Sequence, residues 1–284
     1  MAAVLDRAAF YAAARVNPYP GHLTPLQVSG LDALLDACPP DTPTDHLAYC
    51  LGTCPVETAW TMLPIRERGG ADYLTRMYDI RGGRPSKATE LGNLTPGDGA
   101  LFCGRGLVQL TGRSNYRRAT SRLLALGYLL PGEDLERTPD LAMRSDIASA
   151  IAFVGMAEGW FTGRKLSHYF TATTSDPVGA RRIINGQDRA AEIAGDFRSF
   201  RTALLAANHV PGGVTAAVSV PKAETGPLPA PNPGGGGSGL PPVSRAPLAP
   251  PPEPPRGPVI IAPPEPAKPG FWARLAAWAN RPAA

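Results

Sequence analysis

The sequence has few cysteines and lacks the cysteine patterns that mark metal or redox sites. Its 284 residues include four cysteines, with no Cys-x-x-Cys pair and no Cys/His cluster at zinc-site spacing. Cys50 and Cys54 would share one face of a helix, which is typical of buried free thiols. The others are Cys38 and Cys103, and a disulfide that involves Cys103 stays open as an alternative. We therefore expect no metal and no cofactor.

Long hydrophobic runs and strong charge are also missing. No apolar stretch approaches the length of a membrane-spanning helix. Residues 1–19 hold no basic leader with a continuous apolar run, because Asp6 and Arg7 interrupt them, so we expect no signal peptide. The formal net charge is only +4, and no basic patch interleaved with aromatic residues suggests nucleic acid. We expect a monomer that is made in the cytoplasm.

Proline and glycine are abundant, with 33 and 31 residues, and this is too many for one globular unit. More than half of the prolines fall in residues 211–270, around a Gly-Gly-Gly-Gly-Ser-Gly run. This composition cannot build a core and is typical of a disordered linker. The sequence therefore predicts a folded domain over residues 1–210, a linker over 211–270 and a short amphipathic helix over 271–284.

The C-terminal segment has an apolar stripe. Phe271, Leu275 and Trp278 recur at helical spacing, and Trp272 lies beside them. So short a helix is marginal alone in water, which favours an anchor that folds on a membrane surface or a partner. A terminal tail without a role is the alternative.

Helical periodicity dominates residues 1–207, so we expect a mainly α fold. Thr24 and Pro25 are typical of an N-cap followed by a first-turn proline. The expected helices cover about residues 1–17, 25–35, 44–63, 116–126, 145–160, 177–184 and 190–207. Residues 68–103 are interrupted by glycine and proline, and they predict a small lobe of loops with a short hairpin.

Two carboxylates, Glu57 and Glu67, lie ten residues apart on either side of Pro64. Proline disfavours helical geometry in the residue before it, so the helix that carries Glu57 should end near Leu63. The chain can then return Glu67 from another direction, across a cleft. Hydrolysis of a glycosidic bond requires such a pair of carboxyl groups. Solvated surface charges are the alternative.

An ordered set of motifs follows these two residues. Cys103–Tyr116 reads Cys-Gly-Arg-Gly-Leu-Val-Gln-Leu-Thr-Gly-Arg-Ser-Asn-Tyr, and 180–186 reads Ala-Arg-Arg-Ile-Ile-Asn-Gly. With Glu57-Thr58 before them, these motifs resemble family 19 glycoside hydrolases, the chitinases and phage-type endolysins. The resemblance covers roughly residues 15–205. It implies a lysozyme-like, two-lobed α+β domain.

The resemblance implies that Glu57 is the general acid and Glu67 the base, with inversion at the anomeric carbon. Arg105 can pair with a site carboxylate. Neutral polar side chains in the motif suit sugar hydroxyls and N-acetyl amides. The substrate-binding positions that we predict are Arg105, Gln109, Thr111, Asn115, Tyr116 and Asn185.

The sequence departs from the family pattern at three positions. The family commonly has histidine where Val56 stands, Pro55 falls inside the expected helix, and Gln187 replaces the second glycine of Asn-Gly-Gly. An apolar neighbour would favour the protonated form of Glu57. The absence of the histidine imidazole could equally leave Glu57 without a partner that orients its carboxyl group.

These observations predict a hydrolase of β-1,4 links between N-acetylated sugars. We favour peptidoglycan, as for an endolysin that reaches the cell wall after release or phage delivery. Chitin is the alternative substrate. A catalytically impaired glycan-binding or virion structural protein is a further alternative, which Val56 and Pro55 favour and the presence of both glutamates opposes.

Overall fold

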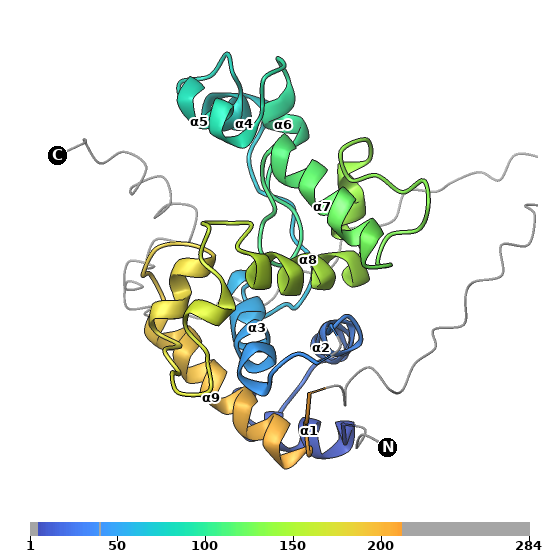
Figure 1. Cartoon of the computed structure of the whole chain (residues 1–284), viewed down its shortest axis with the longest axis vertical. Helices are drawn as coiled ribbons and strands as arrows, with labels where there is room; N and C mark the ends of the chain where they lie inside the picture. The colour runs from blue at the N-terminus through green and yellow to red at the C-terminus, as the bar shows by residue number, and fades with distance from the viewer. Residues whose placement is uncertain (1–4, 40, 212–284) are drawn as a thin grey trace, which may run out of the picture. The chain divides into compact units, whose positions relative to one another are not determined.

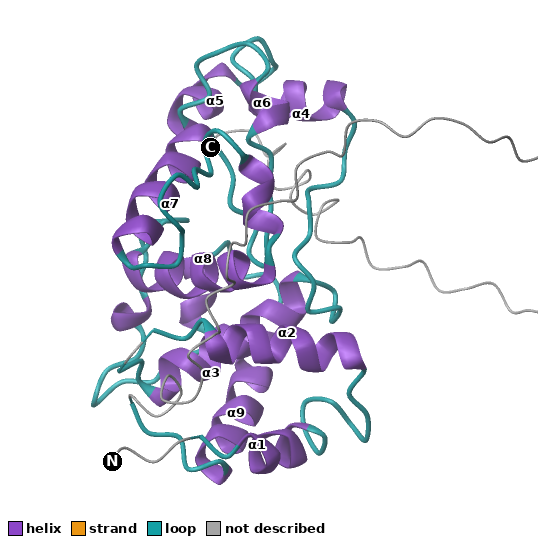
Figure 2. Cartoon of the chain, turned by 90° about the vertical axis from the view of Figure 1, so that its right-hand side faces the viewer, coloured by secondary structure: helices purple, strands orange, loops and turns teal. Residues whose placement is uncertain are grey.

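The computed structural model describes residues 5–39 and 41–211, and this part of the chain is mainly helical (Figures 1 and 2). The α-helices are α1 (Arg7–Ala14), α2 (Pro25–Asp36), α3 (Thr44–Glu57), α4 (Ala71–Tyr78), α5 (Pro85–Leu91), α6 (Asp98–Leu101), α7 (Arg113–Ala125), α8 (Ser145–Glu158) and α9 (Ala190–Ala206). Three 3-10 helices are η1 (Pro139–Met143), η2 (Leu166–His168) and η3 (Gly179–Ile183). No strand occurs in the described ranges, so the predicted mainly α class is confirmed.

Helices α3 and α9 share the most extensive contact between described helices, and Figure 1 shows α9 running along both α3 and α1. A Cβ at Gly52 would lie 2.8 Å from the backbone nitrogen of Phe197, so only glycine permits this approach of the two helices. Leu47, Leu51 and Phe200 are fully buried around the contact. The pair fixes the direction in which the C-terminal end of α3 points.

Helix α8 lies at the centre of the main core. Ten consecutive residues from Ile147 to Met156 are buried, and the helix contacts α2, α3 and α7. It ends at Gly159 in the left-handed conformation (φ 77°), a common helix C-terminus. The predicted helix over 145–160 is therefore confirmed.

The other predicted helices agree with the structure to different degrees. Thr24 and Gln27 form the reciprocal bonds of a capping box at the start of α2, with Pro25 in its first turn. Helix α7 begins three residues earlier than predicted. The predicted helix over 177–184 is instead the 3-10 helix η3, with the Asp176 carboxylate accepting a hydrogen bond from the backbone N–H of Gly179 at 2.8 Å.

The prediction of loops and a hairpin over residues 68–103 is wrong, because this segment forms α4, α5 and α6 (Figure 1). Leu74, Met77 and Tyr78 of α4 pack with Cys103 in a small cluster separate from the main core. These helices are short, so packing and not periodicity stabilises them. The β-type pairing in this region is an antiparallel bridge between Arg105 and Leu110.

A buried carboxylate ties the small lobe together. The fully buried Asp79 side chain accepts hydrogen bonds from the backbone N–H groups of Arg81, Gly97 and Gly99. Burial raises the pKa of Asp79, but the three amides outweigh it and the pKa is lowered. An ionised Asp79 thus joins the end of α4 to the start of α6.

All four cysteines are buried and free, which confirms the free-thiol prediction. No helix in the described residues is long and apolar enough to cross a membrane. Apart from Pro211, the predicted linker over 211–270 and the predicted C-terminal helix over 271–284 lie outside the residues that the structure describes.

Asp196 on α9 predicts a pH-dependent stability. Its side chain is buried, and Oδ2 has no hydrogen-bond partner in the described part of the chain. Burial raises the pKa of Asp196 to about 7, Glu192 adds to this, and Arg189 opposes it. The folded state therefore binds a proton that the unfolded state has lost, so stability should fall as the pH rises from about 4 to 7.

Asp196→Asn should raise the free energy of unfolding at pH 8, on the order of a few kcal/mol, and change it little at pH 4. Urea unfolding at both pH values measures the difference. Asp72→Asn, at an exposed carboxylate, is the matched control. A gain that is equal at both pH values would contradict the prediction.

Candidate active site

The last residue of α3 is Glu57, so this helix ends earlier than the predicted Leu63. The Thr58 hydroxyl donates to the Cys54 carbonyl at 2.8 Å and accepts from the Met62 backbone N–H at 3.1 Å. A side chain that bonds to the backbone in this way competes with helix continuation. Ala59 and Trp60 then adopt the left-handed conformation (φ 50° and 65°), which a right-handed helix cannot include. Pro55 lies within the helix and does not end it.

A buried guanidinium holds Glu57. Nη1 of Arg181, in η3, donates to Oε1 of Glu57, and the two side chains are 1% and 4% exposed. Arg181 is itself fixed, because its Nε donates to the Asp188 carbonyl at 3.0 Å. Arg189 donates from Nη1 to the Val56 carbonyl at 2.9 Å, so a second arginine lies behind the helix end.

Burial raises the pKa of Glu57, Arg181 opposes this through its charge and hydrogen bond, and Asp188 adds to the rise. The net direction is upward. Glu57 therefore keeps its proton to higher pH than an exposed glutamate does. A carboxyl group with these properties can act as a general acid.

Glu67 lies in a different environment. Its backbone N–H donates to the Gly104 carbonyl at 2.7 Å, and the N–H of Ile65 donates to the Gly106 carbonyl at 3.1 Å, so residues 65–67 run beside 104–106. The carboxylate accepts from the Tyr78 hydroxyl at 2.9 Å and from the Gly104 N–H at 3.0 Å. Burial raises the pKa of Glu67, and these two hydrogen bonds partly offset the rise.

Gly104 brings the Gln109 amide beside this carboxylate. A Cβ at Gly104 would lie 2.6 Å from Oε1 of Gln109 and 3.2 Å from Oε2 of Glu67. The Gln109 Nε2 donates to the Ile65 carbonyl at 2.7 Å, but its buried Oε1 has no partner among the described residues. Buried polar atoms normally have partners, so an unpaired amide oxygen here is suited to a donor on bound substrate.

The remaining predicted residues divide into two groups. Thr111 and Asn115 are half-buried, with the Thr111 hydroxyl donating to the Gln109 carbonyl at 2.9 Å and Asn115 Nδ2 donating to the Thr111 carbonyl at 2.8 Å. Asn185 follows η3, is half-buried, and its side chain has no partner within the described part of the chain. These three side chains keep polar atoms that a ligand can use.

Arg105 and Tyr116 require a correction. Arg105 is 2% exposed, and its Nε donates to Asp140 at 2.7 Å instead of pairing with either glutamate. Its Nη1 donates to the Tyr116 hydroxyl at 3.0 Å, and that hydroxyl donates to the Cys103 carbonyl at 2.8 Å. Because both side chains are buried and bonded within the protein, they hold the loop that carries Gln109 and do not reach substrate.

Sequence reasoning missed three residues of this site. Arg181 and Asp188 lie in or beside the 180–186 motif, where the family resemblance directed attention to Asn185. Tyr78 lies in the segment 68–103, for which the sequence predicted only loops and a short hairpin. A pairing between residues 124 positions apart, such as that of Glu57 with Arg181, leaves no periodic signal in the sequence.

No group of three or more histidine, cysteine or acidic side chains in the described ranges is arranged to hold a metal ion.

No family model matches the sequence, and no curated protein matches it either. Among solved structures, chitinase C from Streptomyces griseus HUT6037 is similar, with a TM-score of 0.44 and 19% identity. A mutant of chitinase C is similar with a TM-score of 0.44 and 18% identity. Both matches cover 73% of this chain and 78% of the other.

The Tyr78 hydrogen bond predicts a measurable shift at Glu67. Tyr78→Phe removes a donor that stabilises the ionised carboxylate, so the pKa of Glu67 should rise. A ¹³C titration of the glutamate carboxyl signals measures it. Tyr73→Phe, on the same helix and without a bond to Glu67, is the matched control. An unchanged pKa in Tyr78→Phe, or an equal rise in both variants, would contradict the assignment.

Proposed function

We propose that this protein is a glycoside hydrolase that cleaves β-1,4 links between N-acetylated sugars, with peptidoglycan as the favoured substrate. The observation that carries the proposal is the presence of two buried carboxyl groups with distinct partners. Glu57 is held by a guanidinium, and Glu67 by a phenol and a backbone amide. The motif resemblance to family 19 glycoside hydrolases supports the same chemistry.

Glu57 is the general acid. Burial raises its pKa, and in its protonated form it gives the proton to the departing glycosidic oxygen. The carboxylate that this step leaves behind is stabilised by Arg181, whose Nη1 already binds Oε1. Oε2 is then the oxygen that faces the bond to be cleaved. The same arginine therefore orients the acid and stabilises its conjugate base.

Glu67 is the base. Its ionised carboxylate takes a proton from water while the water oxygen bonds to the anomeric carbon on the face opposite the departing oxygen. Tyr78 and Gly104 favour the ionised form and fix its orientation. The Thr111 hydroxyl donates to the Gln109 carbonyl, so its oxygen is left to accept a hydrogen bond from that water. Attack from the opposite face inverts the anomeric carbon.

Gln109, Asn115 and Asn185 are assigned to the sugar hydroxyl and N-acetyl groups. The unpaired Gln109 Oε1 supports this for an amide or hydroxyl donor. Peptidoglycan is favoured over chitin because the net charge of +4 suits approach to an anionic wall. Chitin oligomers are the comparison substrate in the activity test.

The surroundings of Val56 and Pro55 are compatible with an active enzyme. Val56 is 3% exposed, and its side chain packs in the main hydrophobic core. Its role in the fold is therefore packing. Arg181 supplies the orientation that a neighbouring histidine was expected to give. Pro55 is accommodated inside α3.

The proposal is tested by replacing each carboxyl group with an amide and measuring the loss of activity. Glu57→Gln removes the proton donor and Glu67→Gln removes the base, so each should lower kcat by about 10² or more. Release of soluble fragments from purified peptidoglycan and from a chitin oligomer measures it. Glu90→Gln, at an exposed carboxylate on α5, is the matched control. Activity in the wild type on neither substrate, or near-full activity in both variants, would refute the proposal.

A further inference from the structure

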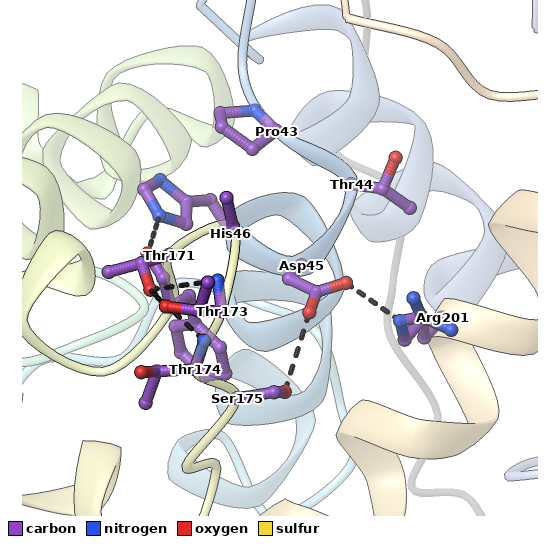
Figure 3. A pocket seen from close by; sticks show the side chains of 11 residues that line it. Pro43, Thr44, Asp45, His46, Thr171, Thr173, Thr174, Ser175 and Arg201 are labelled. Carbon is purple, nitrogen blue, oxygen red and sulfur yellow. Dashed lines mark hydrogen bonds and ion pairs between the residues drawn. The ribbon is translucent and has the colours of Figure 1, made fainter.

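A polar pocket lies at the N-terminal end of α3, away from Glu57. It has a volume of about 590 Å³ and is lined by Pro43–His46, Phe170–Ser175 and Arg201 (Figure 3). Glu57 is the last residue of the same 14-residue helix, so the length of α3 separates the two places by roughly 20 Å. The pocket is therefore not part of the candidate active site.

The loop that forms one wall has a defined structure. An antiparallel bridge joins Phe170 to Ser175, and the Thr171 backbone N–H donates to the Thr174 carbonyl at 2.9 Å. The Thr171 hydroxyl accepts from the N–H groups of Thr173 and Thr174 at 3.2 and 3.0 Å. Behind the loop, Phe170 is buried and stacks on Phe197 of α9 at 5.2 Å between ring centroids. The wall is thus anchored to the core.

The charges of this pocket are paired within it. Arg201 Nε donates to Oδ1 of Asp45 at 2.7 Å, and the Ser175 hydroxyl donates to Oδ2 at 3.4 Å (Figure 3). Burial lowers the pKa of His46, although a bond to the Phe170 carbonyl and Asp45 oppose this, and the lowered pKa favours the neutral imidazole. With one carboxylate facing one guanidinium and a neutral histidine, the pocket favours an uncharged ligand.

The hydrogen-bonding groups suit a sugar. The exposed hydroxyls of Thr173 and Thr174 can donate and accept, and the Ser175 hydroxyl, which donates to Asp45, can still accept. The Asp45–Arg201 pair adds a planar acceptor and a planar donor on one wall. Pro43 supplies an exposed apolar ring against which a sugar face can rest. The volume lies within the range of small-molecule sites.

From this combination we infer that the pocket is a second, non-catalytic binding site for a neutral N-acetylated oligosaccharide. The assignment of an N-acetylated sugar, among neutral sugars, rests on the proposed function of the active site. Two sites on one folded body can engage one polymer at once, which raises the effective concentration of the catalytic groove at an insoluble surface. Hydrolysis of small soluble oligomers does not need the second contact.

The test uses the full-length chain with Arg201→Ala and, as the matched control, Arg198→Ala. Both remove an exposed arginine of α9, but Arg198 does not line the pocket. Loss of the exposed Asp45–Arg201 pair costs little stability, so the variant should fold. In ¹⁵N-labelled protein, tri-N-acetylchitotriose should shift the amide signals of residues 171–175, and Arg201→Ala should weaken that binding on the order of five- to tenfold.

Arg201→Ala should also reduce retention on insoluble polymer and leave kcat/KM on soluble oligomers unchanged. Arg198→Ala should match the wild type in all three measurements. Absence of shifts in residues 171–175, or equal binding by the two variants, would overturn the inference. Sugar binding at these residues in a protein that hydrolyses neither polymer would refute the proposed function alone.

Discussion

The buried contact between the Glu57 carboxyl group and the Arg181 guanidinium is the interaction on which the candidate site depends. Removing two charged groups from water is costly, and the pair is tolerated only with good geometry and further hydrogen bonds. Arg181 has these through Asp188, and Glu57 has its place through the abrupt end of α3. That end is set in turn by Thr58, so one hydroxyl contributes to the position of the acid. Loss of Arg181 would leave the buried Glu57 carboxyl group without this hydrogen-bond donor.

The two carboxyl groups differ in the chemistry of their partners. Burial raises the pKa of both, but a cation opposes the rise at Glu57 and neutral donors oppose it at Glu67. A cation stabilises the charge that forms when an acid gives up its proton, whereas neutral donors stabilise and orient an ionised carboxylate. These different surroundings are the basis for proposing separate roles for two chemically identical side chains. The small lobe contributes directly, because Tyr78 belongs to α4.

Local sequence signals predicted the large helices well. The Thr24 cap and the periodicity of α8 and α9 are properties of neighbouring residues, and the structure confirms them. The helices of the small lobe escaped prediction because their few apolar residues are stabilised by Cys103 and not by periodicity. The sequence identified Glu57, Glu67 and Gln109 as candidate site residues. It could not identify the hydrogen-bond partner of each, because those partners come from distant parts of the chain. Arg105 is an example of what the sequence could not predict. Its charge suggested a contact with a carboxylate of the candidate site, but the side chain is buried and donates to Asp140 instead.

The central claim is that Glu57 and Glu67 act together on opposite faces of the sugar, as acid and base without a covalent intermediate. The most direct measurement is the anomeric configuration of the first product, followed by ¹H NMR within the first minutes of hydrolysis of a β-1,4-linked substrate. The account predicts that the α-anomer appears first and then equilibrates. Initial formation of the β-anomer would contradict it, because retention requires two successive displacements at the anomeric carbon, the first by a carboxylate or by the N-acetyl group of the substrate.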